Sequence, residues 1–436
     1  MIAFSVAFLI FIAGCAGGEV TTGAPTTPFL GGAGGLEISF LEENPPAEVT
    51  DGSTFPFKAI VSLKNVGESD INKNQIKVSL IGFLPSQFNP LTPNNFDETK
   101  LKDRNSLEDL KGRKRDADGN IVEPVETFLE FPEETNKNFD FKDKIVGNNI
   151  FIFRADACYK YQTKVKTDVC VLQNQIDKPA DAICNPSEAK AVFSSASPIK
   201  VTSFRQNVAG KDKLQLSFDI SHAGTGMVFG MSQVLSDIIS LIDLAIIEAS
   251  KSSPTVATVR TDITNAQTKI NTITSPSQKV TEAKTKLTEA KTEADKDTTA
   301  FGVIVDKLKE AKKLLIEESV ACPKDATTRR SVEDKITVNV DTELNAAVAD
   351  DPSTNGIDES KPGYTLKCVG LSDVSRATTA KQSGTLKLIN GKRTLTCTLD
   401  LPVSRSDFVK PMDINVDFNY EQTADTEVLV KRLLTE

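Results

Sequence analysis

The chain has 436 residues, 39% of them hydrophobic, and a formal net charge of −9 at pH 7. The hydrophobic content argues against a chain that is disordered throughout, and the length predicts two to four domains. The acidic balance argues against nucleic acid as a partner, because a nucleic-acid-binding protein needs a basic face to neutralise phosphates.

The first 15 residues predict export and anchoring to a membrane. Positions 1–12 are almost wholly apolar and are followed by Ala13, Gly14 and Cys15. This run suits a secretory signal and is shorter than the about 20 residues of a membrane span. Its end resembles a lipoprotein lipobox, which implies cleavage before Cys15 and lipidation of the Cys15 sulfur. The alternative is an apolar N-terminus followed by an ordinary Cys. A typical signal has a Lys or Arg before its apolar run, and this chain has none there.

Residues 16–35 are rich in Gly, Thr and Pro and predict a flexible tether. After them, residues 36–145 alternate apolar and polar side chains with a period of two, and turn residues separate the runs. Short strands with frequent turns are typical of a β-sandwich. The same pattern predicts a second β-sandwich over 146–229 and a third over 321–436.

Six cysteines remain besides Cys15, an even number that fits an oxidising compartment. They are Cys158, Cys170, Cys184, Cys322, Cys368 and Cys397. None forms a Cys-x-x-Cys pair, and the single His222 is remote from them in sequence, so disulfides are favoured over a zinc site.

One disulfide pairing follows from a predicted hairpin. Cys158 and Cys170 lie symmetrically about Lys164, which predicts a hairpin with a disulfide between its strands. Asn390-Gly391 predicts a second hairpin, between Thr385–Ile389 and Arg393–Leu399. We expect Cys368 to pair with Cys397, which leaves Cys184 and Cys322 as a link across the helical segment. Six cysteines allow 15 pairings, so this connectivity is a hypothesis.

Residues 230–320 change to the spacing of helices. Ser253-Pro254 and Ser275-Pro276 each have the pattern of an N-cap followed by Pro at the first helical position. They divide the segment into three predicted helices, the last of which runs from Pro276 to Leu315 with only Asp297 interrupting its apolar seam. Such spacing predicts a three-helix bundle or coiled-coil hairpin inserted between β domains. Either the apolar faces of these helices pack against one another, or residues 231–320 bind another surface protein or a second copy of the chain.

Several segments resemble a known kind of surface protein. Residues 57–74, and Ser62 to Gly67 above all, look like the strand and turn of CARDB-type immunoglobulin-like (Ig-like) modules. Outside residues 230–320, most of the chain resembles surface lipoproteins of small-genome archaea, on the segments 35–46, 157–170, 224–228, 363–368 and 388–397. The resemblance implies tandem Ig-like domains and a location outside the cell, next to the membrane. It implies no particular activity, and His222 stands where the family more often has Asn.

No motif for catalysis is found. The chain lacks Gly-x-Ser-x-Gly, His-Glu-x-x-His, a Walker A loop and a dinucleotide-binding glycine fingerprint. The segment from Asp116 to Asn120 has some calcium-loop character, but its glycine is misplaced and a solvated hairpin turn is favoured. The basic run from Lys111 to Arg115 is best interpreted as a solvated charge cluster, with an anionic headgroup as the alternative.

The sequence therefore predicts a mainly β protein with tandem Ig-like β-sandwich domains and an α-helical insert. It is expected to be lipid-anchored on the extracytoplasmic face of the cell membrane, with no catalytic, cofactor or metal site. The predicted role is non-catalytic binding, adhesion or envelope structure. The alternative is an accessory subunit of an envelope secretion or transport complex that docks through the helical insert. Ligand, partner and oligomeric state stay open.

Overall fold

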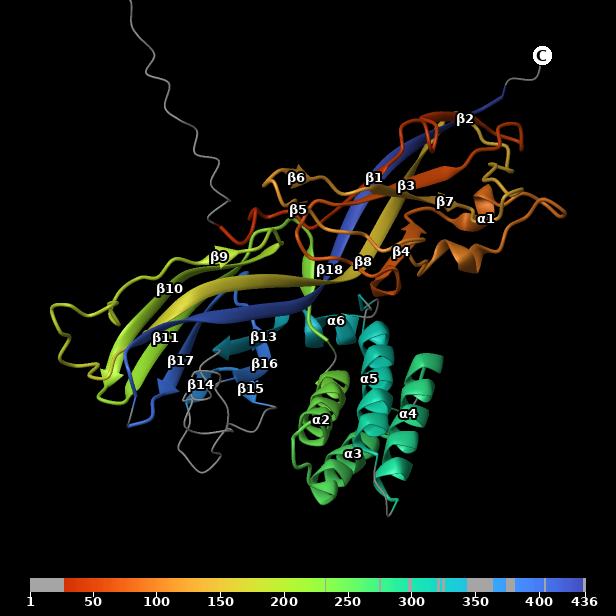
Figure 1. Ribbon diagram of the computed structural model, residues 1–436. Coiled ribbons are helices and arrows are strands. Elements are labelled where there is room, and N and C mark those ends of the chain that lie inside the picture. Colours follow the sequence, from red (N-terminus) through yellow and green to blue (C-terminus); the bar gives the residue numbers. More distant parts are fainter. Residues whose placement is uncertain are drawn as a thin grey trace, which may run out of the picture.

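The computed structural model describes residues 27–231, 233–273, 276–296, 300–319, 322–323, 326–342, 364–373, 381–403 and 405–433. This part of the chain is mainly β, with several antiparallel sheets and a group of helices between β12 (Met227–Phe229) and β13 (Lys335–Thr342) (Figure 1). Among the described helices none is long and apolar enough to cross a membrane.

We call the β-sheets together the β part, and two long strands run through the whole of it. β8 (Asn149–Val171) and β18 (Phe408–Lys431) pair antiparallel along almost their full length, from Val171 opposite Phe408 to Asn149 opposite Val430. They are central in the largest sheet, whose order is β15-β16-β13-β18-β8-β4. The other strands of that order are β4 (Ile76–Ile81), β15 (Ser372–Asp373) and β16 (Lys381–Lys387). β2 (Glu48–Thr50) and β12 pair with β18, and β9 (Phe193–Ser194) pairs with β8.

Two smaller sheets lie at opposite ends of these long strands (Figure 1). One has the order β1-β3-β7, formed by β1 (Leu36–Phe40), β3 (Ala59–Asn65) and β7 (Glu126–Phe131). The other has the order β10-β11-β17-β14, formed by β10 (Ile199–Gly210), β11 (Lys213–His222), β17 (Lys392–Asp400) and β14 (Thr365–Val369). The remaining short elements are α1 (Pro85–Phe88), η1 (Lys73–Gln75), η2 (Glu98–Leu101), β5 (Lys114–Arg115) and β6 (Ile121–Val122).

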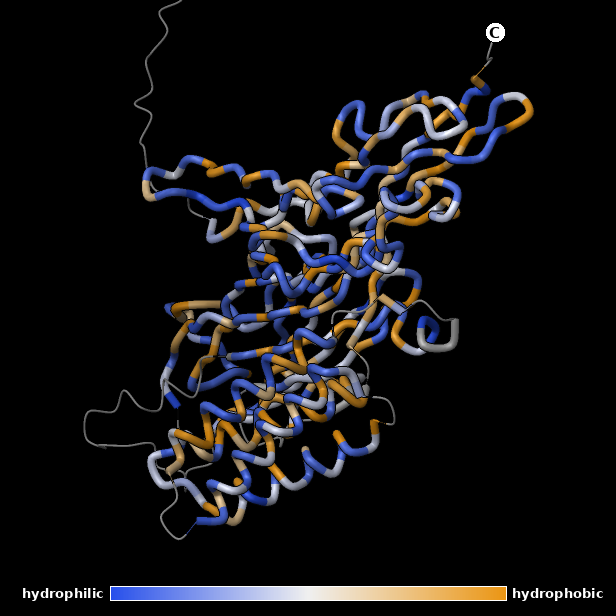
Figure 2. The backbone as a smooth tube through the Cα atoms, turned by 90° about the vertical axis from the view of Figure 1, so that its right-hand side faces the viewer, coloured by the Kyte–Doolittle hydropathy of each residue, from blue (hydrophilic) through white to orange (hydrophobic). Residues whose placement is uncertain are grey.

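The period-two pattern explains how the sheets bury their inner faces. In β8, Phe153 and Tyr159 are buried, whereas Arg154 and Lys164 between the inward positions stay accessible. Figure 2 shows this alternation of hydrophobic and hydrophilic residues along the strands. The buried side chains of all the large sheets form one connected hydrophobic core.

The sheets cross the boundaries of the three predicted β ranges. β4 comes from the first range and pairs with β8 of the second. β11 of the second range pairs with β17 of the third, from Lys213 opposite Asp400 to Ser221 opposite Lys392. The period-two pattern locates each strand but carries no information about its partner, so the boundaries at 145/146 and 320/321 do not separate the sheets.

Both predicted hairpins are wrong. β8 continues straight through Lys164, so Cys158 and Cys170 lie on one strand, about 40 Å apart at about 3.3 Å per residue. The Asn390-Gly391 turn exists, with positive φ at both residues. However, β16 before it joins the largest sheet and β17 after it joins the four-stranded sheet. The turn therefore carries the chain from one sheet to another.

Four helices follow β12 where three were predicted. They are α2 (Gln233–Ala249), α3 (Val256–Ile270), α4 (Gln278–Ala294) and α5 (Phe301–Glu318), and the short α6 (Ala326–Val332) comes after them. Each of the four packs against two others, in the cyclic order α2-α3-α4-α5, and together they bury a second hydrophobic core. We call these four helices the helix bundle. The predicted third helix is thus two helices, α4 and α5, which pack side by side; Asp297 lies outside the described residues.

The helix bundle leaves and rejoins the β part at one place. The Gly230 N–H donates to the Val332 carbonyl at 2.8 Å, and Phe229 and Glu333 form a β-bridge. The two ends of the intervening segment therefore lie next to each other. Figure 1 shows the bundle projecting from one side of the long strands.

Candidate functional site

The base of the helix bundle is fastened to the largest sheet. Cys158 of β8 forms a disulfide with Cys322, across a sequence separation of 164 residues and with Cα atoms 5.6 Å apart. The buried Asn419 of β18 donates from Nδ2 to the carbonyl of Ser319, just after α5, at 2.7 Å. Arg329 of α6 contacts Glu421 of β18 at 2.5 Å. One covalent and two polar contacts thus fix where the bundle leaves the sheet.

The other disulfides hold the far end of the β part. Cys170 pairs with Cys184, and Cys368 pairs with Cys397, with Cα atoms 5.9 and 3.8 Å apart. The predicted Cys368–Cys397 pair is confirmed, and these residues lie opposite each other on β14 and β17. The predicted Cys158–Cys170 and Cys184–Cys322 pairs are wrong, because Cys158 and Cys170 share one extended strand. Cys15 lies outside the described residues.

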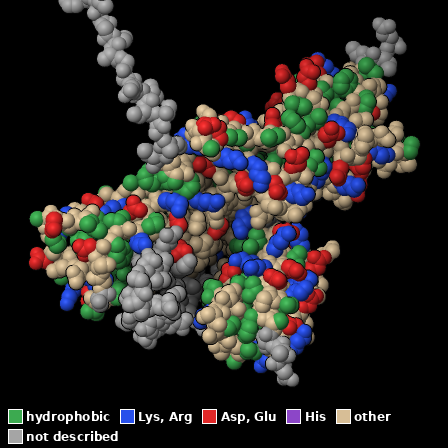
Figure 3. Space-filling model, in the orientation of Figure 1, with side chains coloured by type: hydrophobic (Ala, Val, Ile, Leu, Met, Phe, Trp, Pro, Cys, Tyr) green, Lys and Arg blue, Asp and Glu red, His purple; other side chains and the backbone are tan. Residues whose placement is uncertain are grey.

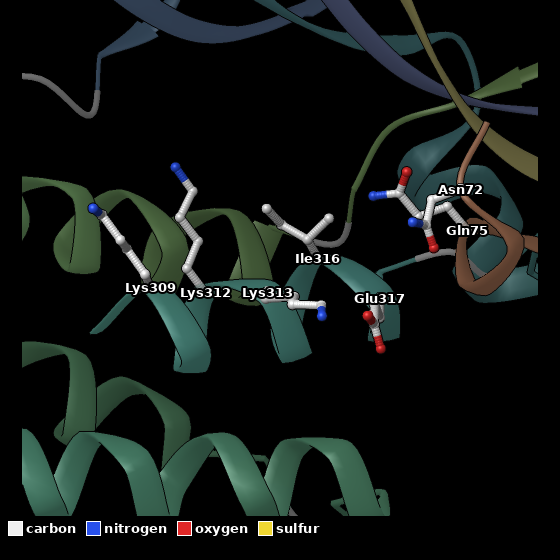
Figure 4. A pocket seen from close by; sticks show the side chains of 7 residues that line it. All are labelled: Asn72, Gln75, Lys309, Lys312, Lys313, Ile316 and Glu317. Atoms are coloured by element: carbon white, nitrogen blue, oxygen red, sulfur yellow. The ribbon is translucent and has the colours of Figure 1, made fainter. Parts of the chain in front are cut away.

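A cleft lies where α5 approaches the β part, and we call it the α5 cleft. It has a volume of about 350 Å³ and is lined by Asn72, Gln75, Lys309, Lys312, Lys313, Ile316 and Glu317. Figure 4 shows the lysines and Ile316 along α5, with Asn72 and Gln75 at the other side of the cleft on the loop that contains η1. The two walls therefore come from residues more than 230 positions apart in the chain.

The charges of the α5 cleft are only partly compensated. Lys312 contacts Asp243 of α2 at 2.6 Å, and Glu317 contacts Lys279 of α4 at 3.0 Å. No described carboxylate lies within ion-pair distance of Lys309 or Lys313, which are both exposed. Burial, followed by the neighbouring charge of Lys279, lowers the pKa of Lys77 on β4, close to Gln75.

A second groove, between α4 and α5, has its polar groups satisfied internally. We call it the α4–α5 groove; its volume is about 330 Å³ and its lining includes three threonines of α4, Glu289, Glu293 and Lys307. Glu289 contacts Lys307 at 3.0 Å, and Glu293 is paired with Lys296. The hydroxyls of the threonines donate to backbone carbonyls four residues earlier, at 2.9 to 3.2 Å for Thr285, Thr288 and Thr292.

The outer face of the largest sheet carries a hydrogen-bonded group beside the bundle. Asp417 of β18 accepts from Gln162 Nε2 at 3.0 Å and from Asn339 Nδ2 at 2.9 Å, and Asn339 in turn accepts from Ser383. Burial raises the pKa of the Asp417 carboxyl, against the opposing effect of Lys160 and Lys312. Side chains of four neighbouring strands are therefore held in fixed orientations.

The features that the sequence singled out as weak candidates have structural roles. Asp116 accepts backbone N–H groups of Asp118 and Asn120, at 3.0 and 2.8 Å, and closes the β5–β6 turn. In the basic run, Lys111 contacts Asp70 at 3.1 Å and Arg113 contacts Glu123 at 2.9 Å. Two of the basic side chains are thus paired with carboxylates, and Arg115 donates to the carbonyl of Gly119 in the β5–β6 turn.

His222 stabilises a turn. Its Nε2 lies 3.0 Å from the Tyr420 hydroxyl, which also accepts from the Gly226 N–H at 2.7 Å. This contact joins the end of β11 to β18 and fixes the turn that leads into β12 and the helix bundle. Burial lowers the pKa of His222, and Asp334 opposes this effect.

Sequence reasoning identified the helical segment as the element of interest but missed the α5 cleft. The spacing of Lys309, Lys312 and Lys313 marks a polar helix face, and nothing in the pattern links it to Asn72 or Gln75. Among the described residues, no group of three or more His, Cys, Asp or Glu side chains is placed to hold a metal ion. No model of a known protein family matches the chain, and no curated protein matches it in sequence.

Proposed function

We propose that the protein is a lipid-anchored, extracytoplasmic surface protein with a non-catalytic role in binding, adhesion or envelope structure. In this proposal the β part is a set of Ig-like sandwiches that carry the helix bundle away from the membrane, and the bundle meets the partner. The observation that supports it best is the placement of the bundle. It projects from one point of the β part and is fixed there by the Cys158–Cys322 disulfide.

The disulfides support the location. All six cysteines of the described residues are paired, and such cross-links persist in oxidising environments outside the cytosol. In this proposal the apolar leader directs export across the membrane, and a lipid on Cys15 anchors the exported protein. The resemblance to archaeal surface lipoproteins with CARDB-type modules points to the same location.

The surface of the bundle supports docking to a protein rather than insertion into lipid. Lys, Arg, Asp and Glu side chains of both signs are interspersed over the face seen in Figure 3. The apolar residues of α3, α4 and α5 are mostly buried in the bundle core, so their outer surface is polar. Such a surface lacks the apolar face with which a helix inserts into lipid, and it leaves contact with a protein in water as the proposed mode.

Replacing the bundle tests its role. Residues 231–320 are exchanged for a Gly/Ser linker that joins Gly230 to residue 321, so that Cys322 and α6 keep their contacts with the sheet. We expect the β part to stay folded by circular dichroism, and partners captured by the full chain from native membranes to be lost. As a control, the β5–β6 hairpin is shortened by the same method, and capture is expected to persist.

The identity of the captured partner separates the two roles. Recovery of envelope or adhesion proteins supports the proposed role, whereas recovery of the subunits of one secretion or transport complex supports the alternative of an accessory subunit. Equal capture with and without the bundle contradicts both.

The anchor is tested separately. We expect membrane-bound protein to begin at Cys15 and to carry the mass of a lipid on that residue. A Cys15→Ser variant is expected to leave the membrane fraction, while the folded part keeps its disulfides. Unmodified protein in the cytosol, with Met1 retained and free thiols, contradicts the proposed location.

A further inference from the structure

The α5 cleft differs from the α4–α5 groove in how its charges are balanced. In the groove, Glu289 and Glu293 are each paired with a lysine. In the cleft, Lys312 and Glu317 are paired with residues of neighbouring helices. Lys309 and Lys313 have no ion-pair contact with a carboxylate of the described residues, so their ammonium groups are available to a ligand.

The two free lysines lie on a rigid wall. Positions four apart on a helix share one face, with about 5–6 Å between their Cβ atoms. The opposite face of α5 buries Ile304, Leu308, Ala311 and Leu315 in the bundle core, which fixes the helix in place. Figure 4 shows their ammonium groups turned to different sides, so each is suited to a separate anionic group of one ligand.

The other wall offers amide groups. The Oδ1 atom of Asn72 accepts a hydrogen bond from the Asn74 N–H at 3.0 Å. The amide nitrogen of Asn72 is therefore the group of this side chain that can donate to a ligand. Gln75 adds a second amide, and Ile316 adds an apolar contact between the lysines and the amides (Figure 4). The lining therefore offers two lysine ammonium groups and two amide groups as hydrogen-bond donors. It selects a ligand that is rich in oxygen acceptors, negatively charged and partly apolar.

We propose that the α5 cleft binds an acidic oligosaccharide that is carboxylated or sulfated on successive sugar units. Separate charged groups contact Lys309 and Lys313, hydroxyls contact the amides of Asn72 and Gln75, and a C–H face packs on Ile316. The volume of about 350 Å³ lies in the range of small-ligand sites. The protein's net charge of −9 disfavours a polyanion elsewhere on its surface, so binding needs such a local basic site.

This inference rests on the proposed extracytoplasmic location, because acidic glycans are met on that side of the membrane. Its test uses the purified full chain and isothermal titration calorimetry with five probes: an oligogalacturonate, a sulfated heparin oligosaccharide, a neutral maltooligosaccharide, inorganic phosphate and vesicles that contain phosphatidylglycerol. We expect one or both acidic oligosaccharides to bind, with affinity that falls as salt rises. The neutral sugar and phosphate are expected not to bind.

Variants locate the site. Lys309→Gln with Lys313→Gln is expected to weaken binding at least tenfold, because two charge-assisted contacts are lost. The matched control is Lys284→Gln with Lys291→Gln on α4, which makes the same change in net charge away from the cleft and is expected to leave affinity unchanged. Hydrogen exchange of α5 and residues 73–75 is expected to slow when the sugar binds.

Three outcomes overturn the inference. They are absence of binding by both acidic oligosaccharides at millimolar concentration, equal weakening by the two double variants, and equal or stronger binding of phosphate or of vesicles that contain phosphatidylglycerol. Any of them removes the saccharide site but leaves the proposed surface role standing, since that role is tested by the anchor and the bundle replacement. Conversely, a cytosolic chain with a functional cleft contradicts the location and not the site.

Discussion

The hydrophobic cores of the β part and of the helix bundle differ in the side chains that they bury and in where those side chains lie in the sequence. The β part buries large aromatic side chains brought together from distant positions: Phe57, Phe88, Phe139 and Phe153 lie with ring centroids 5.2 to 6.0 Å apart. The bundle buries aliphatic and alanine side chains from one continuous segment, such as Leu287, Ala290 and Leu308. The β core therefore depends on long-range pairing, whereas the bundle core depends on local helical spacing. We expect the two to unfold as separate units.

The largest effect is expected in the aromatic core. Phe153→Ala removes a buried ring that contacts Phe57, Phe88 and Phe139, and should lower the free energy of unfolding of the β part by about 3–5 kcal/mol. Urea denaturation followed by circular dichroism measures it. The control Phe128→Ala, at a ring that is 40% exposed, should cost much less. A loss of bundle stability as large as that of the β part contradicts separate unfolding.

A cavity in the bundle core should lower the free energy of unfolding somewhat less, and only that of the bundle. Leu308 is fully buried between the helices, and Leu308→Ala should cost the bundle about 3 kcal/mol. Hydrogen exchange is expected to rise in α2 to α5 and to stay unchanged in β8 and β18. Val303→Ala, at a side chain that is 45% exposed, is the matched control and should change little. Faster exchange in the long strands would show that the two cores are one unit.

Removing the covalent link should cost less again. We expect Cys158→Ser with Cys322→Ser to destabilise the base of the bundle by about 2 kcal/mol, the low end of the usual range, because folded elements already close most of the loop. Helix content should persist, while proteolysis near residues 319–323 becomes faster. The control is Cys368→Ser with Cys397→Ser, which removes a disulfide between β14 and β17 and should leave proteolysis near residues 319–323 unchanged. Unchanged proteolysis would mean that Asn419 and Arg329 hold the bundle without the disulfide.

The smallest expected effect is a pH dependence. Burial lowers the pKa of His222 in the folded state, so the unfolded chain binds more protons as the pH falls through about 6.5. The contribution of His222 to the free energy of unfolding is therefore complete above about pH 6.5 and is lost as the pH falls below that value. We expect the stability difference between the protein and a His222→Gln variant to shrink from pH 7.5 to pH 5.5. A difference that grows as the pH falls contradicts the assignment.

Sequence periodicity predicted the elements better than their partners. It located the strands of β1, β3, β11 and β17 and the helical spacing after residue 230, because each depends on local alternation. It did not show that β11 pairs with β17, nor that β8 is a single strand. The missed break between α4 and α5 has a simple cause: Ala294 and Phe301 are seven residues apart, so the apolar seam keeps its heptad spacing across the turn.

The candidate site was predictable only in part. The helical segment stands out by its change of pattern. The Cys368–Cys397 pair was proposed without a predicted pairing of their strands, and in the structure the two residues lie opposite each other on β14 and β17. The α5 cleft depends on Asn72 and Gln75 of an early loop facing α5, an arrangement that no local pattern encodes. The Cys158–Cys322 link depends on the same arrangement of bundle and sheet.

The central claim is that the helix bundle is displayed outside the cell and makes the contact with a partner. Crosslinking of intact cells with a membrane-impermeant, lysine-reactive reagent, followed by mass spectrometry, tests both parts at once. The account predicts intermolecular crosslinks concentrated on lysines of α3, α4 and α5, with few on the β part. Crosslinks confined to the β part, or labelling that appears only after the cells are lysed, would contradict it.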